Sequence, residues 1–389
     1  MISYGTGKTT MNDFSGIIVK KVESRADMSV FIRLPWHIYR TDACWVPPLT
    51  VERKMHFSPG NPYFRHAECC FWMAFRHGRP VGRISAQVDR LYLRRYRDDT
   101  GFWGVLEAED DPAIFHALMN TAGAWLQEHG MKRALGPFNL SINQECGLLV
   151  KGFETPPSMM MGHAPRYYSR HIEELGYRKA MDLIAYSIRK EPRILERMRR
   201  ILGRRNGDFR TRPLRKRDFQ QELDTMFAIF NDAWSENWGF VPFTREEYME
   251  TGRLLRFFAD PGLIRIAEVN GEPAGFIVVL PNLNEIMQGL DGRLFPLGWL
   301  KLLAGLKFHR FRTARVLLMG VLKKYQDSLT GAALSLGLIR DVMNEVMHTS
   351  ITELELSWIL EDNLPMRRII EALGAEPYKI YRIYEKDLA

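Results

Sequence analysis

The sequence lacks the features that mark a metal centre, a disulfide framework or a membrane span. It has four cysteines in 389 residues, none of them in a C-x-x-C pair, and Cys69 and Cys70 are adjacent, which rarely suits a structural disulfide. It has no run of about eighteen apolar residues. Its N-terminus has no continuous apolar segment of the signal-peptide kind. These absences predict a cytoplasmic protein in a reduced setting, without a metal site or a transmembrane helix.

The bulk composition is that of a globular protein with an anionic partner. A length of 389 residues favours two domains over one. The formal net charge of +8 and the pI near 9.3 indicate a negatively charged partner. Nucleic acid, an anionic lipid surface and a phosphorylated cofactor all meet that description.

Two short patterns occur twice in the same order. Residues 78–84 (GRPVGRI) and 271–277 (GEPAGFI) share a G-x-P-x-G turn before an apolar run. Residues 172–176 (IEELG) and 370–374 (IEALG) each end a helix at a glycine. The two patterns lie about one hundred residues apart in both cases, which predicts two copies of one fold.

The duplication divides the chain into three parts: an N-terminal copy at residues 15–190, a basic linker at 191–207 and a C-terminal copy at 208–389. Each copy is predicted to be a mixed α/β sheet with helices on its faces. In the second copy we expect a hairpin at Ile264–Leu280, strands near Phe209–Leu214, Ala314–Met319, Thr352–Trp358 and Ile380–Tyr384, and helices at Asp218–Trp234, Arg245–Phe258, Gly331–Met347 and Leu364–Leu373.

The second copy has a candidate pyrophosphate seat. A strand ending at Val321 leads through a loop into a long helix, and a helix N-terminus offers converging N–H groups and a positive dipole end. This loop resembles that of the GNAT superfamily of acyltransferases, with Gln326-x-x-Leu329-x-Gly331 where the family has Gln/Arg-x-x-Gly-x-Gly/Ala. The resemblance implies acyl-CoA as co-substrate, bound by Met319, Gly320, Val321, Gln326, Leu329, Gly331 and Ala332. Leu329 departs from the family pattern.

The next strand and helix resemble the second GNAT hallmark. There, two neighbouring strands splay apart around the pantetheine arm, and the resemblance assigns Asn363 to that arm or to the helix cap. Glu361 or Asp362 is predicted to take the proton of the attacking amine, although acidic residues before a helix also simply favour its N-terminus. The family often has a tyrosine where Ile370 stands, so Tyr381 and Tyr384 are the candidate acids, or else core residues.

The first copy lacks such a seat, because the acidic run Glu107–Asp111 follows its corresponding strand and would repel pyrophosphate. A polar stretch follows later in this copy. Its residues 139, 141, 143 and 145 alternate and are predicted to share one face of an extended segment. We interpret Asn139, Ser141, Asn143, Glu145, His163, Tyr167 and Tyr168 as candidate substrate-binding residues; an ordinary irregular loop is the alternative.

Residues 293–315 combine helically spaced leucines and aromatic residues with five or more basic groups. This composition is typical of a helix that lies at an anionic membrane surface, here peripherally at the inner membrane. A helix that caps the sheet with its charges in water is the alternative.

The chain as a whole resembles a bacterial group of long GNAT-like proteins that includes the ceramide synthases. The segments that carry the resemblance include 31–36, 45–49, 61–64 and 136–147. It implies transfer of a fatty acyl group from acyl-CoA to the amine of a sphingoid base. One rival is a Fem-like transferase that uses aminoacyl-tRNA, against which the acyl-CoA loop argues, so nucleic acid is not the expected partner. The other is a non-catalytic GNAT scaffold that binds lipid or protein.

Overall fold

The structure is a computed structural model that describes residues 16–203, 209–256 and 260–388. Position 15 of the predicted first copy, 204–207 of the predicted linker, and 208, 257–259 and 389 of the predicted second copy lie outside these ranges. The chain forms two compact units. The first unit contains residues up to Leu183 together with Ile286–Leu303 and Lys379–Ala389, and the second contains Ile184–Glu285 and Ala304–Tyr378. The units are therefore interleaved along the chain, whereas the predicted ranges are continuous, and those ranges stay a prediction.

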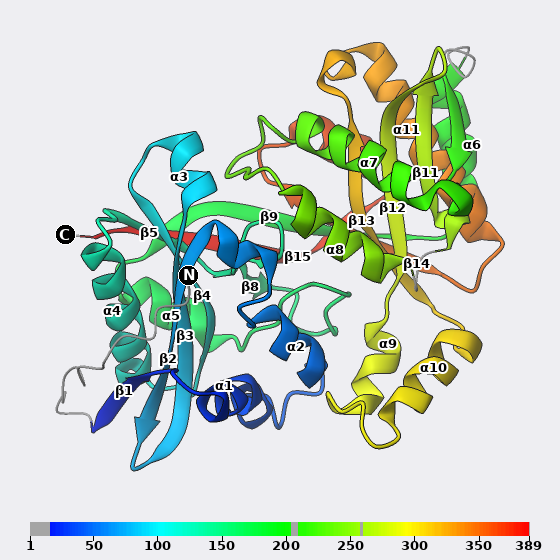
Figure 1. Cartoon of the computed structure of the whole chain (residues 1–389). Coiled ribbons are helices and arrows are strands. Elements are labelled where there is room, and N and C mark those ends of the chain that lie inside the picture. The colour runs from blue at the N-terminus through cyan, green and yellow to red at the C-terminus, as the bar shows by residue number, and fades with distance from the viewer. Residues whose placement is uncertain (1–15, 204–208, 257–259, 389) are drawn as a thin grey trace. The chain divides into compact units, whose positions relative to one another are not determined.

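The first unit is a mixed sheet with helices on both faces (Figure 1). Its strands lie in the order β1-β2-β3-β4-β5-β15, with β1 to β4 antiparallel and β4 parallel to β5. Gly82 of β3 faces helix α4, whereas Arg83 donates to Phe31 of α1, so these helices cover opposite faces. The elements are β1 (Ile17–Lys21), α1 (Arg25–Ile38), α2 (Thr50–His56), η1 (Pro62–Arg65), β2 (Ala67–Arg76), β3 (Arg79–Asp89), α3 (Arg90–Tyr96), β4 (Thr100–Ala108), α4 (Pro112–Glu128), β5 (Arg133–Gly136), β6 (Phe138–Asn139), β7 (Glu145–Cys146), β8 (Leu148–Lys151), α5 (Tyr167–Glu174) and most of β15 (Glu376–Asp387).

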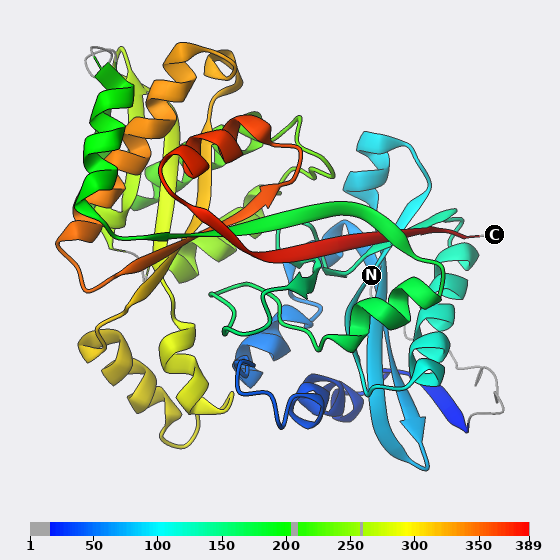
Figure 2. The same ribbon diagram turned by 180° about the vertical axis from the view of Figure 1, so that it is seen from behind.

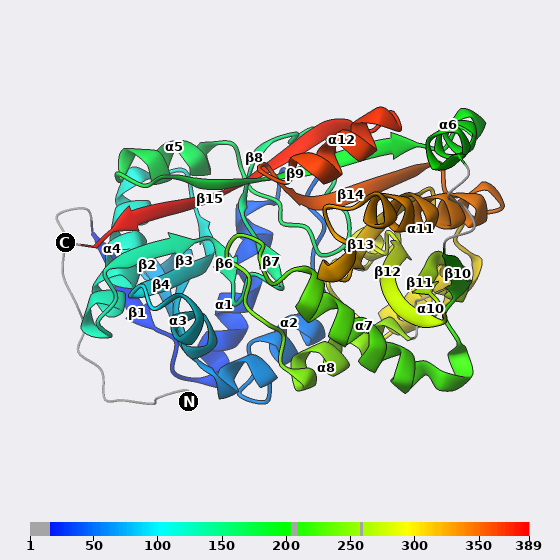
Figure 3. The same ribbon diagram turned by 90° about the horizontal axis from the view of Figure 1, so that it is seen from above.

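The second unit repeats this plan, with strands in the order β9-β14-β13-β12-β11-β10. Figure 3 shows α6, α11 and α12 on one side of the sheet and α7 on the other. The helix predicted at Arg245–Phe258 is α8, which ends at Leu255. The elements are β9 (Arg178–Arg189, which begins in the first unit), α6 (Pro192–Leu202), β10 (Arg210–Pro213), η3 (Lys216–Asp218), α7 (Phe219–Ala233), α8 (Arg245–Leu255), η4 (Pro261–Leu263), β11 (Ile264–Val269), β12 (Glu272–Pro281), α9 (Asn284–Met287), η5 (Gln288–Leu290), α10 (Gly298–Phe308), β13 (Thr313–Val321), η6 (Lys323–Tyr325), α11 (Leu329–Met347), β14 (Glu353–Leu360) and α12 (Leu364–Ala372).

The repeated sequence patterns mark equivalent places in the two units. The first glycine of each G-x-P-x-G pattern is the second residue of a two-residue hairpin turn, and both turn residues have positive φ. The φ angles are 51° and 77° at His77-Gly78, and 53° and 83° at Asn270-Gly271. This is the type I′ geometry that strongly favours glycine. The glycines that close α5 and α12, Gly176 and Gly374, have φ of 83° and 97°. The predicted duplication of an α/β fold is confirmed.

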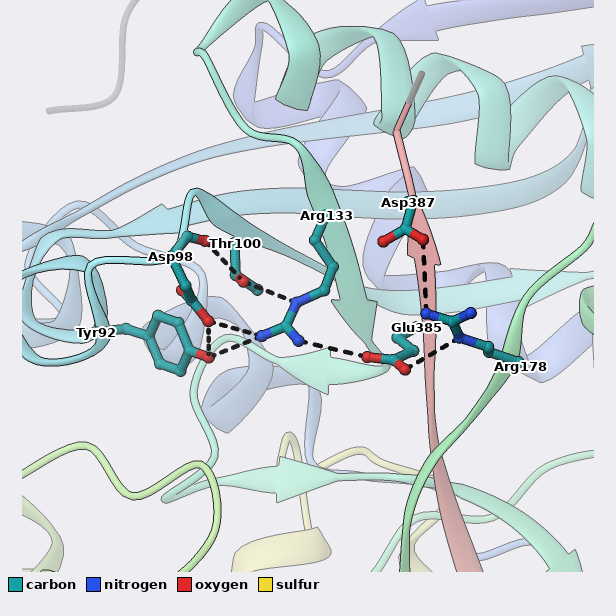
Figure 4. A network of polar contacts seen from close by, with 7 residues as sticks. All are labelled: Tyr92, Asp98, Thr100, Arg133, Arg178, Glu385 and Asp387. Atoms are coloured by element: carbon teal, nitrogen blue, oxygen red, sulfur yellow. Dashed lines mark hydrogen bonds and ion pairs between the residues drawn. The ribbon is translucent and has the colours of Figure 1, made fainter.

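A network of charged side chains holds the C-terminal strand in the first unit (Figure 4). In strand order, β15 lies between β5 and β9 (Figure 2). Glu385 of β15 accepts hydrogen bonds from Arg133 of β5 at 3.5 Å and from Arg178 of β9 at 3.1 Å. Arg133 also donates to Asp98 at 2.7 Å, and Arg178 pairs with Asp387 at 3.5 Å. Such part-exposed pairs contribute about 0.2–1 kcal/mol each, so they fix the strand register more than they add stability.

Candidate active site

Strands β13 and β14 of the second unit pair over only part of their length. Residues Thr313–Val316 lie parallel to Glu353–Leu356, but β13 continues to Val321 and β14 to Leu360. Val279 pairs with Val316 and Val278 with Leu318, so Leu317 is an extra residue that shifts the register of β13 against β12. This bulge bends β13 at the point where it leaves β14. The two strands therefore diverge at the carboxyl end of the sheet.

Helix α11 begins next to this divergence and has an N-terminus suited to an anion. The hydroxyl of Ser328 caps it by accepting the N–H of Gly331 at 3.1 Å. The first N–H groups of a helix have no partner within the helix, so a helix start of this kind can bind an external acceptor such as a phosphate oxygen. A Cβ at Gly331 would lie 2.1 Å from the carbonyl oxygen of Tyr325, so only glycine fits there. Leu329, which replaces the family's glycine, is 66% exposed.

The loop between β13 and α11 is held by bonds to α7 and to β13. The side-chain amide of Gln326 donates to the carbonyl of Ala233 at 2.9 Å and to that of Val321 at 2.8 Å. The indole N–H of Trp234 donates to the carbonyl of Met319 at 3.1 Å. The residues predicted to bind acyl-CoA thus lie together, at the end of β13, in the loop and in the first turn of α11. Gln326 uses its amide nitrogen to fix the loop.

The predicted catalytic residues are divided between the two units. Asn363 caps α12, where its side-chain oxygen accepts the N–H of Met366 at 3.2 Å. Glu361 is half-buried at the end of β14 and Asp362 is exposed. Tyr381 and Tyr384 are fully buried in the part of β15 that belongs to the first unit. The phenol of Tyr384 donates to Glu173 of the same unit at 2.8 Å, and burial followed by that carboxylate raises its pKa. Their catalytic roles stay predictions.

Four polar residues next to the divergence were not singled out from the sequence. Three of them are buried, Arg315 on β13 and Glu355 and Ser357 on β14, and the fourth, Tyr378 at the start of β15, is half-buried. The signal that could have found them is the spacing of Glu355 and Ser357, two polar residues on one face of a central strand that should be buried on both faces.

The four carboxylates of the acidic run all form hydrogen bonds or ion pairs with other residues of the first unit. Glu107 is half-buried and accepts hydrogen bonds from the phenols of Tyr39 at 2.8 Å and Tyr168 at 2.9 Å. Burial raises the pKa of Glu107, against the opposing effect of Arg83. The other three carboxylates are paired as follows: Glu109 with His37 and Arg79, Asp110 with His171 and Arg170, and Asp111 with Arg76. Carboxylates thus surround the start of α4, the helix equivalent to α11.

The polar row of the first unit is not the extended segment that its alternation predicts. Residues 140–144 form a turn between β6 and β7, because Leu140 takes a positive φ of 90°. The hydroxyl of Ser141 accepts the N–H of Asn143 within that turn. Asn139 and Glu145 do lie opposite each other, with the Asn139 amide donating to Glu145 at 3.0 Å. The prediction of one continuous face was wrong.

The remaining predicted substrate-binding residues are engaged within the first unit. His163 pairs with Asp42 at 2.7 Å. The phenols of Tyr167 and Tyr168 bond to the two backbone groups of Ala108, at 2.7 and 2.8 Å. These residues therefore brace the end of β4, and a role in substrate binding stays a prediction.

The segment between β12 and β13 carries an exposed apolar helix. None of the eleven residues of α10 is buried. Within and beside it, six large apolar side chains are exposed: Phe295 (77%), Leu297 (62%), Trp299 (43%), Leu300 (46%), Leu303 (55%) and Phe308 (73%). In the first unit, Asp291 ahead of this helix accepts the indole N–H of Trp36 at 2.7 Å. The described ranges contain no helix both long and apolar enough to cross a membrane.

No candidate metal site is formed by the residues that the structure describes. Across residues 16–203, 209–256 and 260–388, no three His, Cys, Asp or Glu side chains are placed to hold a metal ion together.

Comparison with known proteins gives two full-length relatives. The chain is 43% identical over 383 residues to the bacterial ceramide synthase of Caulobacter vibrioides, covering 98% of this chain and 99% of that protein. It is 42% identical over 381 residues to protein YghO of Escherichia coli, covering 98% and 97% of the two chains. No protein-family profile matches the chain.

Solved structures give the same fold. A tandem GNAT protein from the clavulanic acid biosynthesis pathway superposes with a TM-score of 0.54 at 14% identity, covering 96% of this chain and 99% of that one. A GCN5-related N-acetyltransferase from Sphaerobacter thermophilus gives a TM-score of 0.50 at 13% identity, with 97% of both chains covered. The predicted tandem GNAT fold is confirmed.

Proposed function

Because this chain belongs to the bacterial ceramide synthase family of tandem GNAT acyltransferases, we propose that it transfers a fatty acyl group from acyl-CoA to the amine of a sphingoid base. The observation that carries the proposal is the start of α11. There Gly331 permits the close approach of the loop, and the helix N-terminus faces outward beside two diverging strands. A pyrophosphate fits the helix start, and the pantetheine arm fits between the strands.

The reaction that such a site supports is direct acyl transfer. The amine of the acceptor loses a proton and attacks the thioester carbonyl, and backbone N–H groups stabilise the developing oxyanion. Glu361 and Asp362 are the candidate proton acceptors from the sequence, and Asn363 would contact the pantetheine arm as well as cap α12. Tyr381 and Tyr384 are the candidate proton donors to the departing thiolate.

The acceptor is lipid-like in this proposal, and the exposed face of α10 would bring the protein to it. Six exposed apolar side chains are accompanied by basic residues of the same segment, Arg293, Lys301, Lys307, Arg310 and Arg312. Apolar and aromatic side chains enter the boundary of a bilayer while basic groups contact anionic headgroups. We therefore infer that the predicted segment 293–315 binds the surface of an anionic membrane through residues 293–312, whereas Arg315 is buried on β13 and takes no part.

The test of the proposed reaction is the release of free CoA thiol by the purified protein. We expect release that requires both a long-chain acyl-CoA and a sphingoid base, with the amide product identified by mass spectrometry. Release with only acetyl-CoA and small amines would retain the acyltransferase and reject the ceramide product. No release and no CoA binding would favour the aminoacyl-tRNA transferase or the non-catalytic scaffold.

The assigned seat is tested by Gly331→Glu, which places a carboxylate and a clashing Cβ at the start of α11. We expect acyl-CoA binding to be abolished in calorimetry, while circular dichroism shows that the overall fold is retained and the melting temperature falls because of the local clash. The matched control is Thr349→Glu, an exchange in the turn after the other end of α11. Unchanged affinity in a folded Gly331→Glu variant would reject the seat.

The membrane contact is tested by sedimentation with vesicles of phosphatidylglycerol or of phosphatidylcholine. Wild type is expected to bind the anionic vesicles, and the double variant Trp299→Ser, Phe308→Ser to lose most of that binding. The control is Val51→Ser with Met55→Ser, two exposed apolar residues on α2. Equal binding by both double variants would place the membrane contact elsewhere.

A further inference from the structure

A cluster of four polar side chains lies where β13 and β14 stop pairing. Arg315 of β13 stands opposite Glu355 of β14 in the second-last pair of the parallel register. Ser357 is the first residue of β14 beyond the paired part, and Tyr378 of β15 completes the cluster, which we call the Glu355 cluster. Arg315, Glu355 and Ser357 are only 2%, 5% and 7% exposed. All four residues belong to the second unit.

The contacts within the cluster centre on the carboxylate. Both the Ser357 hydroxyl and the Tyr378 phenol donate hydrogen bonds to Glu355, one to each oxygen. The guanidinium of Arg315 donates from Nε to the Ser357 hydroxyl oxygen at 3.0 Å and lies 3.7 Å from Glu355. Ser357 is therefore a hydroxyl that accepts from a cation and donates to a carboxylate, which is the arrangement of a proton relay.

A purely structural role explains this cluster poorly. Burying an ion pair carries a desolvation penalty, and well-packed apolar residues in its place are often as stable or more stable. The neighbouring Trp358 strengthens the point, because its indole N–H is buried and has no hydrogen-bond partner among the described residues. An unmet donor and a carboxylate relay side by side at the mouth of two diverging strands suit a polar substrate.

We propose that Glu355 is the proton acceptor for the attacking amine, reached through the Ser357 hydroxyl. The ammonium of the acceptor gives one proton to the Ser357 oxygen as the hydroxyl proton passes to Glu355. The free amine forms the C–N bond with the thioester carbonyl carbon, and the C–S bond breaks. The second proton of the nitrogen neutralises the thiolate, and Glu355 returns its proton to solvent. Arg315 and Tyr378 are positioning residues that hold the carboxylate and the serine.

This inference rests on the proposed acyl transfer and changes the assignment of its base. Glu361 lies at the far end of β14, next to the exposed Asp362. Glu355 instead lies where the strands separate, level with the residue before Val316 and close to the bulge at Leu317. The vertex between the strands is where a thioester carbonyl and an incoming amine would meet, so the deeper carboxylate is the better placed.

The decisive variant is Glu355→Gln, compared with Glu353→Gln as the matched control. Glu353 is on the same strand and also accepts a hydrogen bond from a serine, Ser187. We expect Glu355→Gln to lower kcat roughly 100-fold at neutral pH, the usual contribution of a general base. Its kcat/KM should then rise about tenfold per pH unit towards the pKa of the amine, because only the free amine reacts without a base. Wild type and Glu353→Gln should show a plateau instead.

A second pair of variants keeps the test valid if Glu355→Gln does not fold. Tyr378→Phe should lower kcat about tenfold and shift the pH profile, because the carboxylate loses one of its two hydroxyl donors. Tyr186→Phe removes a phenol that donates to Glu371 in the same unit and should leave both unchanged. A wild-type pH profile in folded Glu355→Gln or Tyr378→Phe would overturn this inference alone. Absence of acyl transfer by wild type would overturn the proposed function, and the inference with it.

Discussion

The strand-to-helix connections of the two units start from the same plan and end with opposite chemistry. Helix α4 begins with Asp111 as its cap and has the buried Ile114 at its third position. Helix α11 begins with Ser328 as its cap and has Gly331 at its third position. A carboxylate cap satisfies the first N–H groups with a fixed negative charge, whereas a hydroxyl cap leaves the dipole free for an external anion. One duplicated fold therefore carries one candidate seat.

The two units also differ in what lies next to the bulge of their fourth strand, β4 in the first unit and β13 in the second. Strand β4 has a register shift against β3 at Arg83 and Ser85, the counterpart of the shift in β13. In the first unit the chain itself closes over this bulge, since the Asn139 amide oxygen accepts the N–H of Val105 at 2.8 Å. A Cβ at Gly104 would lie only 1.7 Å from the carbonyl oxygen of Phe138. The first unit thus keeps the fold, but its own backbone at Phe138 and Asn139 occupies the space beside the bulge where a ligand would otherwise lie.

The largest expected effect comes from giving α11 the cap of α4. Ser328→Asp keeps a good capping residue but sets a carboxylate where phosphate groups would bind. We expect acyl-CoA affinity to fall roughly 10- to 100-fold, or about 1.4–2.7 kcal/mol, with an unchanged or slightly higher melting temperature. Calorimetry with acyl-CoA measures the affinity. The reverse exchange, Asp111→Ser, should create no second binding site, because Glu107, Glu109 and Asp110 still surround the start of α4. Unaltered affinity in Ser328→Asp would break the comparison.

A smaller effect on acyl-CoA affinity, with a loss of stability instead, is expected where the first unit closes over its bulge. Asn139→Ala leaves the Val105 N–H without its acceptor and removes a donor to Glu145. We expect a loss of about 1–3 kcal/mol in the free energy of unfolding, measured in urea. Acyl-CoA affinity should stay at the wild-type value. A fall in acyl-CoA affinity at constant stability would show that Asn139 contacts the co-substrate.

The smallest effect concerns the connections between the third and fourth strands of each unit. In the second unit Glu285 ties both ends of the excursion from residue 283 to 312, accepting from His309 at 2.8 Å and from the N–H of Thr313 at 2.8 Å. Burial alone would raise the pKa of Glu285, but the bonds from Thr313, His309 and Arg312 outweigh it and lower the pKa. The stabilisation is therefore present above about pH 4.3 and is lost as the pH falls towards the lowered pKa.

We expect Glu285→Gln to speed amide hydrogen exchange in the excursion several-fold at neutral pH, as acidification does for wild type. The corresponding carboxylate of the first unit is Asp89, which caps α3 and lies 3.0 Å from His66. Asp89→Asn should speed exchange in the α3 region only. Exchange in residues 283–312 that is insensitive to both the variant and the pH would contradict this account.

Much of the architecture could be predicted from local sequence patterns. The positive φ angles of two tight turns require glycine at positions 78 and 271, and a requirement of this kind can be read from a single residue. Helical periodicity predicted α7, α11 and α12 to within a few residues, because an amphipathic stripe and a cap are local features. The alternation of polar residues at 139–145 gave a wrong prediction of an extended segment. The left-handed conformation of Leu140 turns the chain into a hairpin there, and the spacing of polar residues does not indicate such a turn.

The sequence by itself determined the duplication, and it predicted the acyl-CoA loop at Gln326–Gly331 and the lack of such a loop in the first copy, because each of these patterns depends on residues close together in the chain. Only the tertiary structure decided that the C-terminal strand belongs mostly to the first unit, and that Arg315, Glu355, Ser357 and Tyr378 form one cluster. The contacts of Tyr378 with Glu355, of Arg315 with Ser357 and of Arg133 with Glu385 join residues 23, 42 and 252 positions apart. They follow from strand order and register, which are set by packing of the whole sheet and not by any local pattern.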